Sequence, residues 1–221
     1  YIFAMEFSLL EWAKTNKTLP QQCDLQTVSY PIDGAQSLAQ MEPTHFWFAS
    51  RREQLLKLLK KYVPQNAYGL DIGCGSGFNT DYFSKNGFPT MGIDAHEIHR
   101  LPSAESLGFI RGDIFSIEPR AEFDFITLLD VIEHIEHDQK FLQQVMRFLK
   151  PGGFIIITAP AFSFLWSPVD EISGHYRRYT KQQMNVLAKD LSLSVKKQFY
   201  FYGSVLPLYF ASRILRKVKK N

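Results

Sequence analysis

Carboxylates and glycines follow the short apolar runs of this sequence. Asp71 lies in a run that ends at Ile72, and three glycines then occupy alternate positions, Gly73, Gly75 and Gly77. Glycine permits a tight turn with φ > 0 and lets a ligand approach main-chain N–H groups, to which the next helix adds unpaired donors. The stretch predicts a cradle for a nucleotide-type ligand, with plain close packing of strand on helix as the alternative.

Further acids end the runs that follow. Asp94 lies about 20 residues beyond the turn, where a carboxylate accepts from both hydroxyls of an adenosine ribose, although it would also cap the next helix. Asp113, followed by apolar Ile114, predicts a hydrogen bond to an adenine amino group and packing on the ring. Parallel strands end along one edge of their sheet, so these acids and Asp130 predict a single crevice.

The apolar periodicity predicts the elements that position these side chains. Strands are expected at 67–72, 89–93, 109–111, 123–129, 154–158 and 193–202, and helices at 51–62, 78–85, 96–106, 138–149 and 180–189. Their alternation predicts an α/β fold with a doubly wound, mostly parallel, Rossmann-like sheet flanked by helices. We expect this domain at 45–202, after a helical lead-in at 1–44 and before an apolar and basic tail at 203–221.

Two histidines, one arginine and one tyrosine are candidates for binding a second substrate or for taking its proton. His134 follows a predicted strand, and His175 lies in a long stretch, 159–179, for which we expect no regular structure. A histidine that titrates near neutral pH can take a proton from an oxygen acceptor, although a loop histidine can equally bond only its own backbone. We expect His175, Arg178 and Tyr179 to shape the acceptor pocket, with solvated arginines as the alternative.

An aromatic cluster precedes the glycine turn. Phe46 and Trp47 stand just before Arg51, on a helix with an apolar stripe. The cluster predicts either a cover for the bound ligand, with Arg51 binding a carboxylate, or a part of the core.

Composition narrows the function classes. The 221 residues carry a net charge of +3, and five basic residues sit together near the end, so we expect no nucleic-acid partner. Cys23 and Cys74 lie far apart, which suggests neither a disulfide framework nor a metal knuckle and fits a reducing, cytoplasmic location. We expect no secretory leader and no spanning segment. The apolar stretch 199–215 with its basic end predicts peripheral contact with an anionic bilayer, or a packed helix with a solvated end.

Two ligands compete for the crevice. A dinucleotide fingerprint needs a third small residue where this chain has Phe78, and nearby acids disfavour a diphosphate. A sulfonium cofactor, S-adenosylmethionine, carries positive charges that favour those acids.

Five motifs in order resemble the class I S-adenosylmethionine-dependent methyltransferases, most closely a small-molecule branch that includes quinone-biosynthesis enzymes. They are Leu70-Asp71-Ile72-Gly73-Cys74-Gly75-Ser76-Gly77, Gly92-Ile93-Asp94, Gly112-Asp113-Ile114, Phe123-Asp124-Phe125-Ile126 with Asp130-Val131-Ile132-Glu133-His134, and Leu149-Lys150-Pro151-Gly152-Gly153. The resemblance implies that Asp71 and the turn hold the methionine part, Asp94 the ribose, and Asp113 and Ile114 the adenine. The implied cofactor-binding set is Arg51, Asp71, Gly73, Cys74, Gly75, Asp94, Ala95, Asp113, Ile114 and Leu129.

The resemblance also implies the reaction. We expect in-line methyl transfer from S-adenosylmethionine to a small molecule, with a lipid-like compound, a quinone and a sugar-linked compound as the candidate acceptors and S-adenosylhomocysteine as the product. The alternatives are a nicotinamide-dependent oxidoreductase and a catalytically silent S-adenosylmethionine-binding protein. Residues 130–134 also resemble a stretch of some quinone methyltransferases in which two acids and a histidine hold a divalent cation. Capping of the next helix explains the same residues, and we expect no metal.

Overall fold

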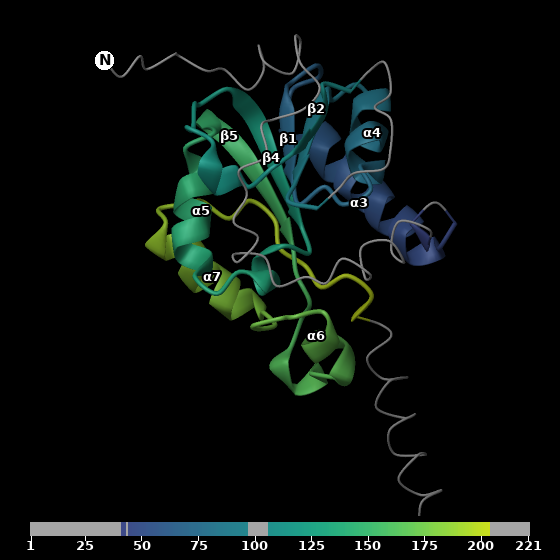
Figure 1. Cartoon of the computed structure of the whole chain (residues 1–221), viewed down its shortest axis with the longest axis vertical. Coiled ribbons are helices and arrows are strands. Elements are labelled where there is room, and N and C mark those ends of the chain that lie inside the picture. Colours follow the sequence, from purple (N-terminus) through teal and green to yellow (C-terminus); the bar gives the residue numbers. More distant parts are fainter. Residues whose placement is uncertain (1–40, 43, 97–105, 204–221) are drawn as a thin grey trace, which may run out of the picture. The chain divides into compact units, whose positions relative to one another are not determined.

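A parallel sheet organises the part of the chain before Thr180. The structure is a computed structural model that describes residues 41–42, 44–96 and 106–203. Five strands run in the order β3-β2-β1-β4-β5, every neighbouring pair parallel (Figure 1). They are β1 (Gly69–Ile72), β2 (Thr90–Asp94), β3 (Gly108–Arg111), β4 (Phe123–Leu129) and β5 (Leu149–Thr158). This confirms the predicted doubly wound sheet, and its carboxyl ends share one edge beside the switch point between β1 and β4.

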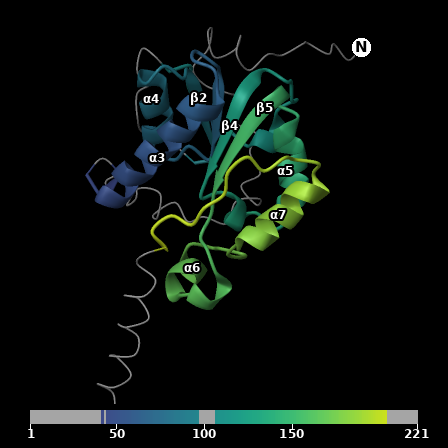
Figure 2. The same ribbon diagram turned by 180° about the vertical axis from the view of Figure 1, so that it is seen from behind.

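Helices cover both faces of the sheet. Figures 1 and 2 show α3 (Phe46–Tyr62) and α4 (Phe78–Lys85) on one side and α5 (Asp138–Met146) on the other. The leucine stripe of α3 is buried against aromatic side chains of α4 and of the strands, as expected for an amphipathic helix on a sheet. The members of this core cluster are Leu55, Leu56, Leu59, Val63, Ala67, Phe83, Phe88, Phe125 and Leu129.

The predicted boundary between α5 and β5 is wrong. The helix ends at Met146, and the strand begins at Leu149 and includes the Pro-Gly-Gly stretch expected to separate the two. A shift of register between Phe123 and Phe125 accommodates the extra residues, and Gly152 has φ +80°. Glycine there lets the strand bend without the steric cost that a side chain would meet.

The stretch 159–179 is more regular than expected. It contains a 3-10 turn, η4 (Ser163–Leu165), and a short helix, α6 (Pro168–Ile172). Ser167 and Asp170 form a capping box at the start of α6, in which the side chain of each residue accepts a hydrogen bond from the backbone N–H of the other. The helix therefore gives Asp170 a fixed place in a segment that we expected to be a loop.

The chain from Thr180 forms a second compact unit. Thr180 caps α7 (Lys181–Asp190) through a capping box with Gln183, which confirms the predicted helix. The predicted strand at 193–202 is wrong: these residues form no strand, and Val195 and Phe199 are exposed despite their alternation. Alternation makes a strand only where neighbouring backbone completes the ladder.

Several of the expected segments consist mostly of residues that the structure does not describe. Most of the lead-in (1–44), most of the helix expected at 96–106 and the tail after Gly203 lie outside the described residues. Among the described helices, none is both long enough and apolar enough to cross a bilayer.

Candidate active site

The glycine turn lies between β1 and α4, and its glycines have different reasons to be glycine. Gly73, Gly75 and Gly77 all have positive φ, at 70°, 56° and 74°. A Cβ on Gly73 would come within 2.6 Å of Val131, and one on Gly77 within 2.3 Å of the Phe109 ring. A Cβ on Gly75 would meet nothing within 4 Å. Two of the glycines therefore serve close packing, whereas Gly75 borders open space.

Acids from the next two strands join this turn. The carboxylate of Asp94, at the end of β2, accepts from Gly75 N at 2.7 Å and from His96 N at 2.8 Å. Burial raises the pKa of Asp94, while these two backbone donors oppose the rise. Asp113 follows β3 and accepts from Phe115 N at 2.9 Å, which caps the short turn η2 (Ile114–Ser116). The structure thus brings three of the predicted cofactor residues to one edge.

Asp71 lies beneath the turn and is buried, with 1% of its surface exposed. Its oxygens accept from Thr80 Oγ1 at 2.7 Å and from Thr127 Oγ1 at 2.6 Å. Burial raises the pKa of Asp71 to about 6. In this structure Asp71 ties β1 to α4 and β4, and Cys74 beside it is also buried.

Arg51 reaches the same edge from α3. It forms an ion pair with Asp130, which follows Leu129 at the end of β4 and also accepts from Thr158 Oγ1 at 2.9 Å. Asp130 has φ +57°, a conformation that a non-glycine residue rarely adopts. Phe46 and Trp47, earlier on the helix, are exposed, so they are not part of the core. Their role as a cover for the bound ligand stays a prediction.

Two predicted histidines meet beside the turn. His134 belongs to η3 (Ile132–His134), directly after the Val131 that touches Gly73, and its ring lies 4.6 Å from the ring of His175 in an edge-on arrangement. Tyr176 N donates to Glu133 O at 2.7 Å, which anchors the 159–179 segment here. Burial, and then His175, lower the pKa of His134 to about 4. His134 is therefore neutral at physiological pH.

Glu133 stands next to this pair. It is 1% exposed, and its Oε2 has no hydrogen-bond partner in the described part of the chain. Burial, and then Asp130, raise the pKa of Glu133 well above its ordinary value. Ligand atoms of Glu133, His134 and His175 lie within 4.8 Å of one another. This group contains His175 where the set that the resemblance implied has Asp130, which pairs with Arg51.

The predicted acceptor residues Arg178 and Tyr179 are held by other side chains. Arg178 forms an ion pair with Asp170, and the Tyr179 hydroxyl donates to Asp138 at 2.8 Å. Asp170 itself was not among the predicted site residues. Its signals were local, a Ser-x-x-Asp capping box and a histidine five residues later, and they gained meaning only once α6 was placed.

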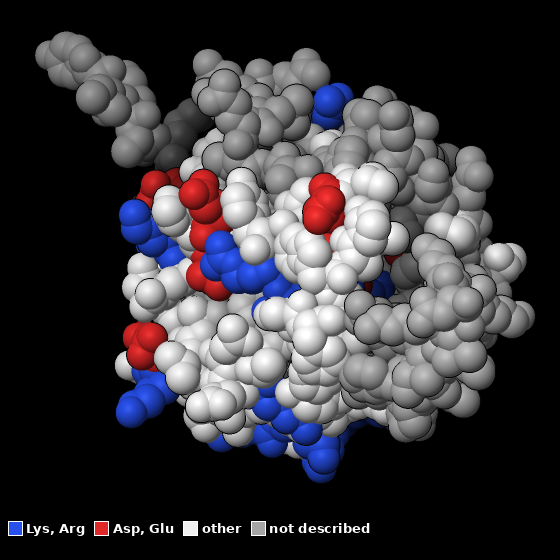
Figure 3. Space-filling view, turned by 90° about the horizontal axis from the view of Figure 1, so that it is seen from below, with Lys and Arg blue, Asp and Glu red and all other residues white. Residues whose placement is uncertain are grey.

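Part of the surface around α6 carries no charged side chains. Seen from the end at which α6 lies, Lys and Arg and Asp and Glu frame a broad area that carries neither (Figure 3). Five large apolar side chains of this segment are exposed, namely Phe164, Trp166, Val169, Ile172 and Tyr176.

Comparison with known proteins agrees with this geometry. The family model described as "Methyltransferase domain" matches residues 45–198. The ubiquinone biosynthesis O-methyltransferase of Bradyrhizobium sp. (strain ORS 278) is 30% identical over 96 residues, which are 40% of this chain and 38% of the relative. Its counterpart from Shewanella sp. (strain ANA-3) is 27% identical over 112 residues, 44% of this chain and 48% of the relative. The matched region thus spans less than half the length of these relatives.

Solved structures show the same fold. A chain in the complex of the Haloferax volcanii Trm112 methyltransferase activator with a methyltransferase has a TM-score of 0.63 at 18% identity, covering 76% of this chain and 77% of that one. The Haemonchus contortus phosphoethanolamine N-methyltransferase 2, in complex with S-adenosyl-L-methionine, has a TM-score of 0.53 at 22% identity, covering 75% and 42%. By its family match and its sheet, the chain belongs to the methyltransferase domain family, with the fold of the class I S-adenosylmethionine-dependent methyltransferases.

Proposed function

We propose that the chain binds S-adenosylmethionine at the carboxyl edge of the sheet and transfers its methyl group to a hydroxyl of a small, partly apolar molecule. The observation that carries the proposal is the turn at Gly75, where open space adjoins the backbone of the turn and the Asp94 carboxylate that it binds. Bound there, S-adenosylmethionine would supply a methyl group made electrophilic by the sulfonium. The S-adenosyl-L-methionine complex of the Haemonchus contortus enzyme supports the same donor, and the names of the curated relatives support methyl transfer to oxygen.

The residues divide the work as follows. Gly73, Cys74 and Gly75 offer backbone to the methionine part, while Asp94 with Ala95 takes the ribose. Asp113 and Ile114 take the adenine, and Leu129 closes the pocket at the end of β4. A bound carboxylate would compete with Asp130 for the Arg51 guanidinium, because both are anions that the same fork can pair. Asp71 supports the turn from below through its two threonines.

An acceptor with an apolar part suits the exposed side chains around α6, and the relatives named for ubiquinone biosynthesis support this choice. We place the protein in the cytoplasm, with peripheral membrane contact through the tail, and we expect neither a nucleic-acid partner nor a metal. Sedimentation with vesicles of anionic lipid at low salt tests the contact, which is excluded if the protein stays in the supernatant.

The donor and the acceptor are tested together by isotopic methyl transfer from S-adenosylmethionine to a cell extract, followed by identification of the labelled compound. Asp94→Ala should weaken S-adenosylmethionine binding at least tenfold, since a hydrogen bond to a charged group contributes about 1.5–3 kcal/mol. Glu118→Ala is the matched control, because it removes an acid whose side chain is 80% exposed and distant in sequence from the turn. Unchanged affinity in Asp94→Ala would remove the ribose contact from the proposal.

A further inference from the structure

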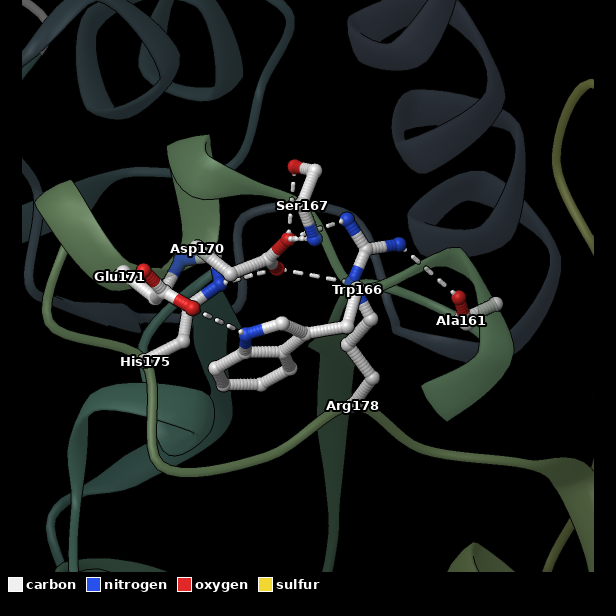
Figure 4. A network of polar contacts seen from close by, with 7 residues as sticks. All are labelled: Ala161, Trp166, Ser167, Asp170, Glu171, His175 and Arg178. Carbon is white, nitrogen blue, oxygen red and sulfur yellow. Dashed lines mark hydrogen bonds and ion pairs between the residues drawn. The ribbon is translucent and has the colours of Figure 1, made fainter. Parts of the chain in front are cut away.

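The side chain of Asp170 is buried, with 1% of its surface exposed, and both of its carboxylate oxygens accept hydrogen bonds from protein groups. Its Oδ1 accepts from His175 Nδ1 at 2.9 Å and from Arg178 Nε at 2.7 Å. Its Oδ2 accepts from Arg178 Nη2 at 2.9 Å and from both the backbone N and the Oγ of Ser167, at 2.8 and 2.9 Å. Figure 4 shows the carboxylate between these partners.

These contacts fix the charge of Asp170. Burial alone would raise the pKa of Asp170, but the hydrogen bonds from Arg178, and then from His175 and Ser167, hold it well below its ordinary range. An ionised carboxylate accepts hydrogen bonds and donates none. The His175 nitrogen that faces it, Nδ1, must therefore carry a proton, and in a neutral imidazole this leaves the lone pair on Nε2.

We propose that Asp170 is a positioning residue for methyl transfer, which holds His175 with Nδ1 protonated and Nε2 free to take the proton of the acceptor hydroxyl. The inference rests on the proposed function. In the step, the hydroxyl proton passes to Nε2 and the hydroxyl oxygen bonds the methyl carbon. The bond from that carbon to sulfur breaks, and its electron pair stays on sulfur. One positive charge thereby moves from the sulfonium to the His175 imidazolium, which later releases its proton to water.

The surroundings of His175 suit this step. Asp170 of α6 lies against the ring that becomes positive, and Arg178 shares that carboxylate, so the pair of cations has one fixed anion between them. From η3, His134 and Glu133 also face the ring. Because burial lowers the pKa of His134, this neighbour stays neutral and adds no repulsion to the imidazolium. The same lowered pKa makes His134 a weak base.

The tautomer is measured directly by nitrogen-15 NMR of the histidine rings in the full chain, at neutral pH. The protein has six histidines, and His175→Ala identifies the signal of His175. We expect Nδ1 of His175 to be protonated in the wild type, and Asp170→Asn to shift the ring toward the tautomer protonated on Nε2. Glu171→Gln, a neighbour on α6 that also loses a charge, should change nothing. A wild-type ring protonated on Nε2, or the same tautomer in Asp170→Asn, overturns the proposal.

Kinetics with the acceptor found by isotopic labelling separate positioning from a merely structural role. Asp170→Asn should lower kcat by about 100-fold, the lower end of what general-base catalysis contributes, with S-adenosylmethionine affinity unchanged. In a His175→Ala background the same substitution should cause no further loss, because its effect passes through His175. A further loss of similar size would assign Asp170 a structural role. Failure of the proposed function is recognised separately, as a folded wild-type chain that binds no S-adenosylmethionine.

Discussion

Replacement of Gly75 by alanine separates a ligand cradle from a packing turn. Alanine at φ +56° costs about 1 kcal/mol, at the low end for a left-handed residue, and the added Cβ meets no atom within 4 Å, so no collision adds to that cost. We therefore expect the melting temperature to fall by only about 2–4 °C. The affinity for S-adenosylmethionine should nevertheless fall at least tenfold, because the added methyl group fills the open space at Gly75 beside the Asp94 carboxylate.

Two further alanine variants complete this experiment. Gly152→Ala is the matched control, because Gly152 also has positive φ and open space around its Cβ, but it lies near the start of β5 rather than at the carboxyl edge. It should lose similar stability and keep its affinity. Gly73→Ala adds a contact of 2.6 Å with Val131, so overpacking should cost about 1–3 kcal/mol more in urea unfolding. Titration calorimetry measures affinity, and a Gly75→Ala variant that binds as the wild type refutes the cradle.

Three further predictions concern the packing of the core, the pH dependence caused by buried Asp71, and methyl transfer without a metal ion. Leu59 is fully buried, so Leu59→Ala should lower the free energy of unfolding by about 2–5 kcal/mol in urea, and a loss under 1 kcal/mol would contradict the packing of α3. The pKa of Asp71 is raised in the folded state to about 6, so the folded protein binds more protons than the unfolded chain and stability falls as pH rises from 4 to 6. Between these limits the wild type should lose roughly 2 kcal/mol relative to Asp71→Asn, and a constant difference would show that Asp71 titrates normally. Methyl transfer should persist in EDTA; an activity lost with EDTA and restored by a divalent cation would instead assign a metal to Glu133 and its histidine neighbours.

Most of the alternating strands and helices could be predicted from the sequence because the signals that begin and end them are local. The continuous apolar run of β4 and the start and stop residues of α4 gave boundaries that the structure confirms. The boundary of α5 with β5 was wrong because Pro-Gly-Gly normally ends an element, whereas here a register shift lets it lie within a strand. The strand expected at 193–202 was wrong because alternation says nothing about whether a partner is present.

The candidate site was predictable in its residue types and less so in its pairings. Acids at strand ends follow from the topology of a parallel sheet, which places Asp94 beside Gly75. The ion pair of Arg51 with Asp130 joins residues 79 positions apart, and no local pattern announces it. The same holds for the contact of His134 with His175, which depends on how the segment 159–179 returns to the sheet.

The central claim is that the carboxyl edge of this sheet receives S-adenosylmethionine. Its most direct test is titration calorimetry of the wild-type chain with S-adenosylmethionine and, side by side, with NADH. We predict saturable binding of one S-adenosylmethionine per chain, competition by S-adenosylhomocysteine and no heat of binding from NADH. Binding of NADH, or a folded protein that takes up no S-adenosylmethionine, would contradict the account.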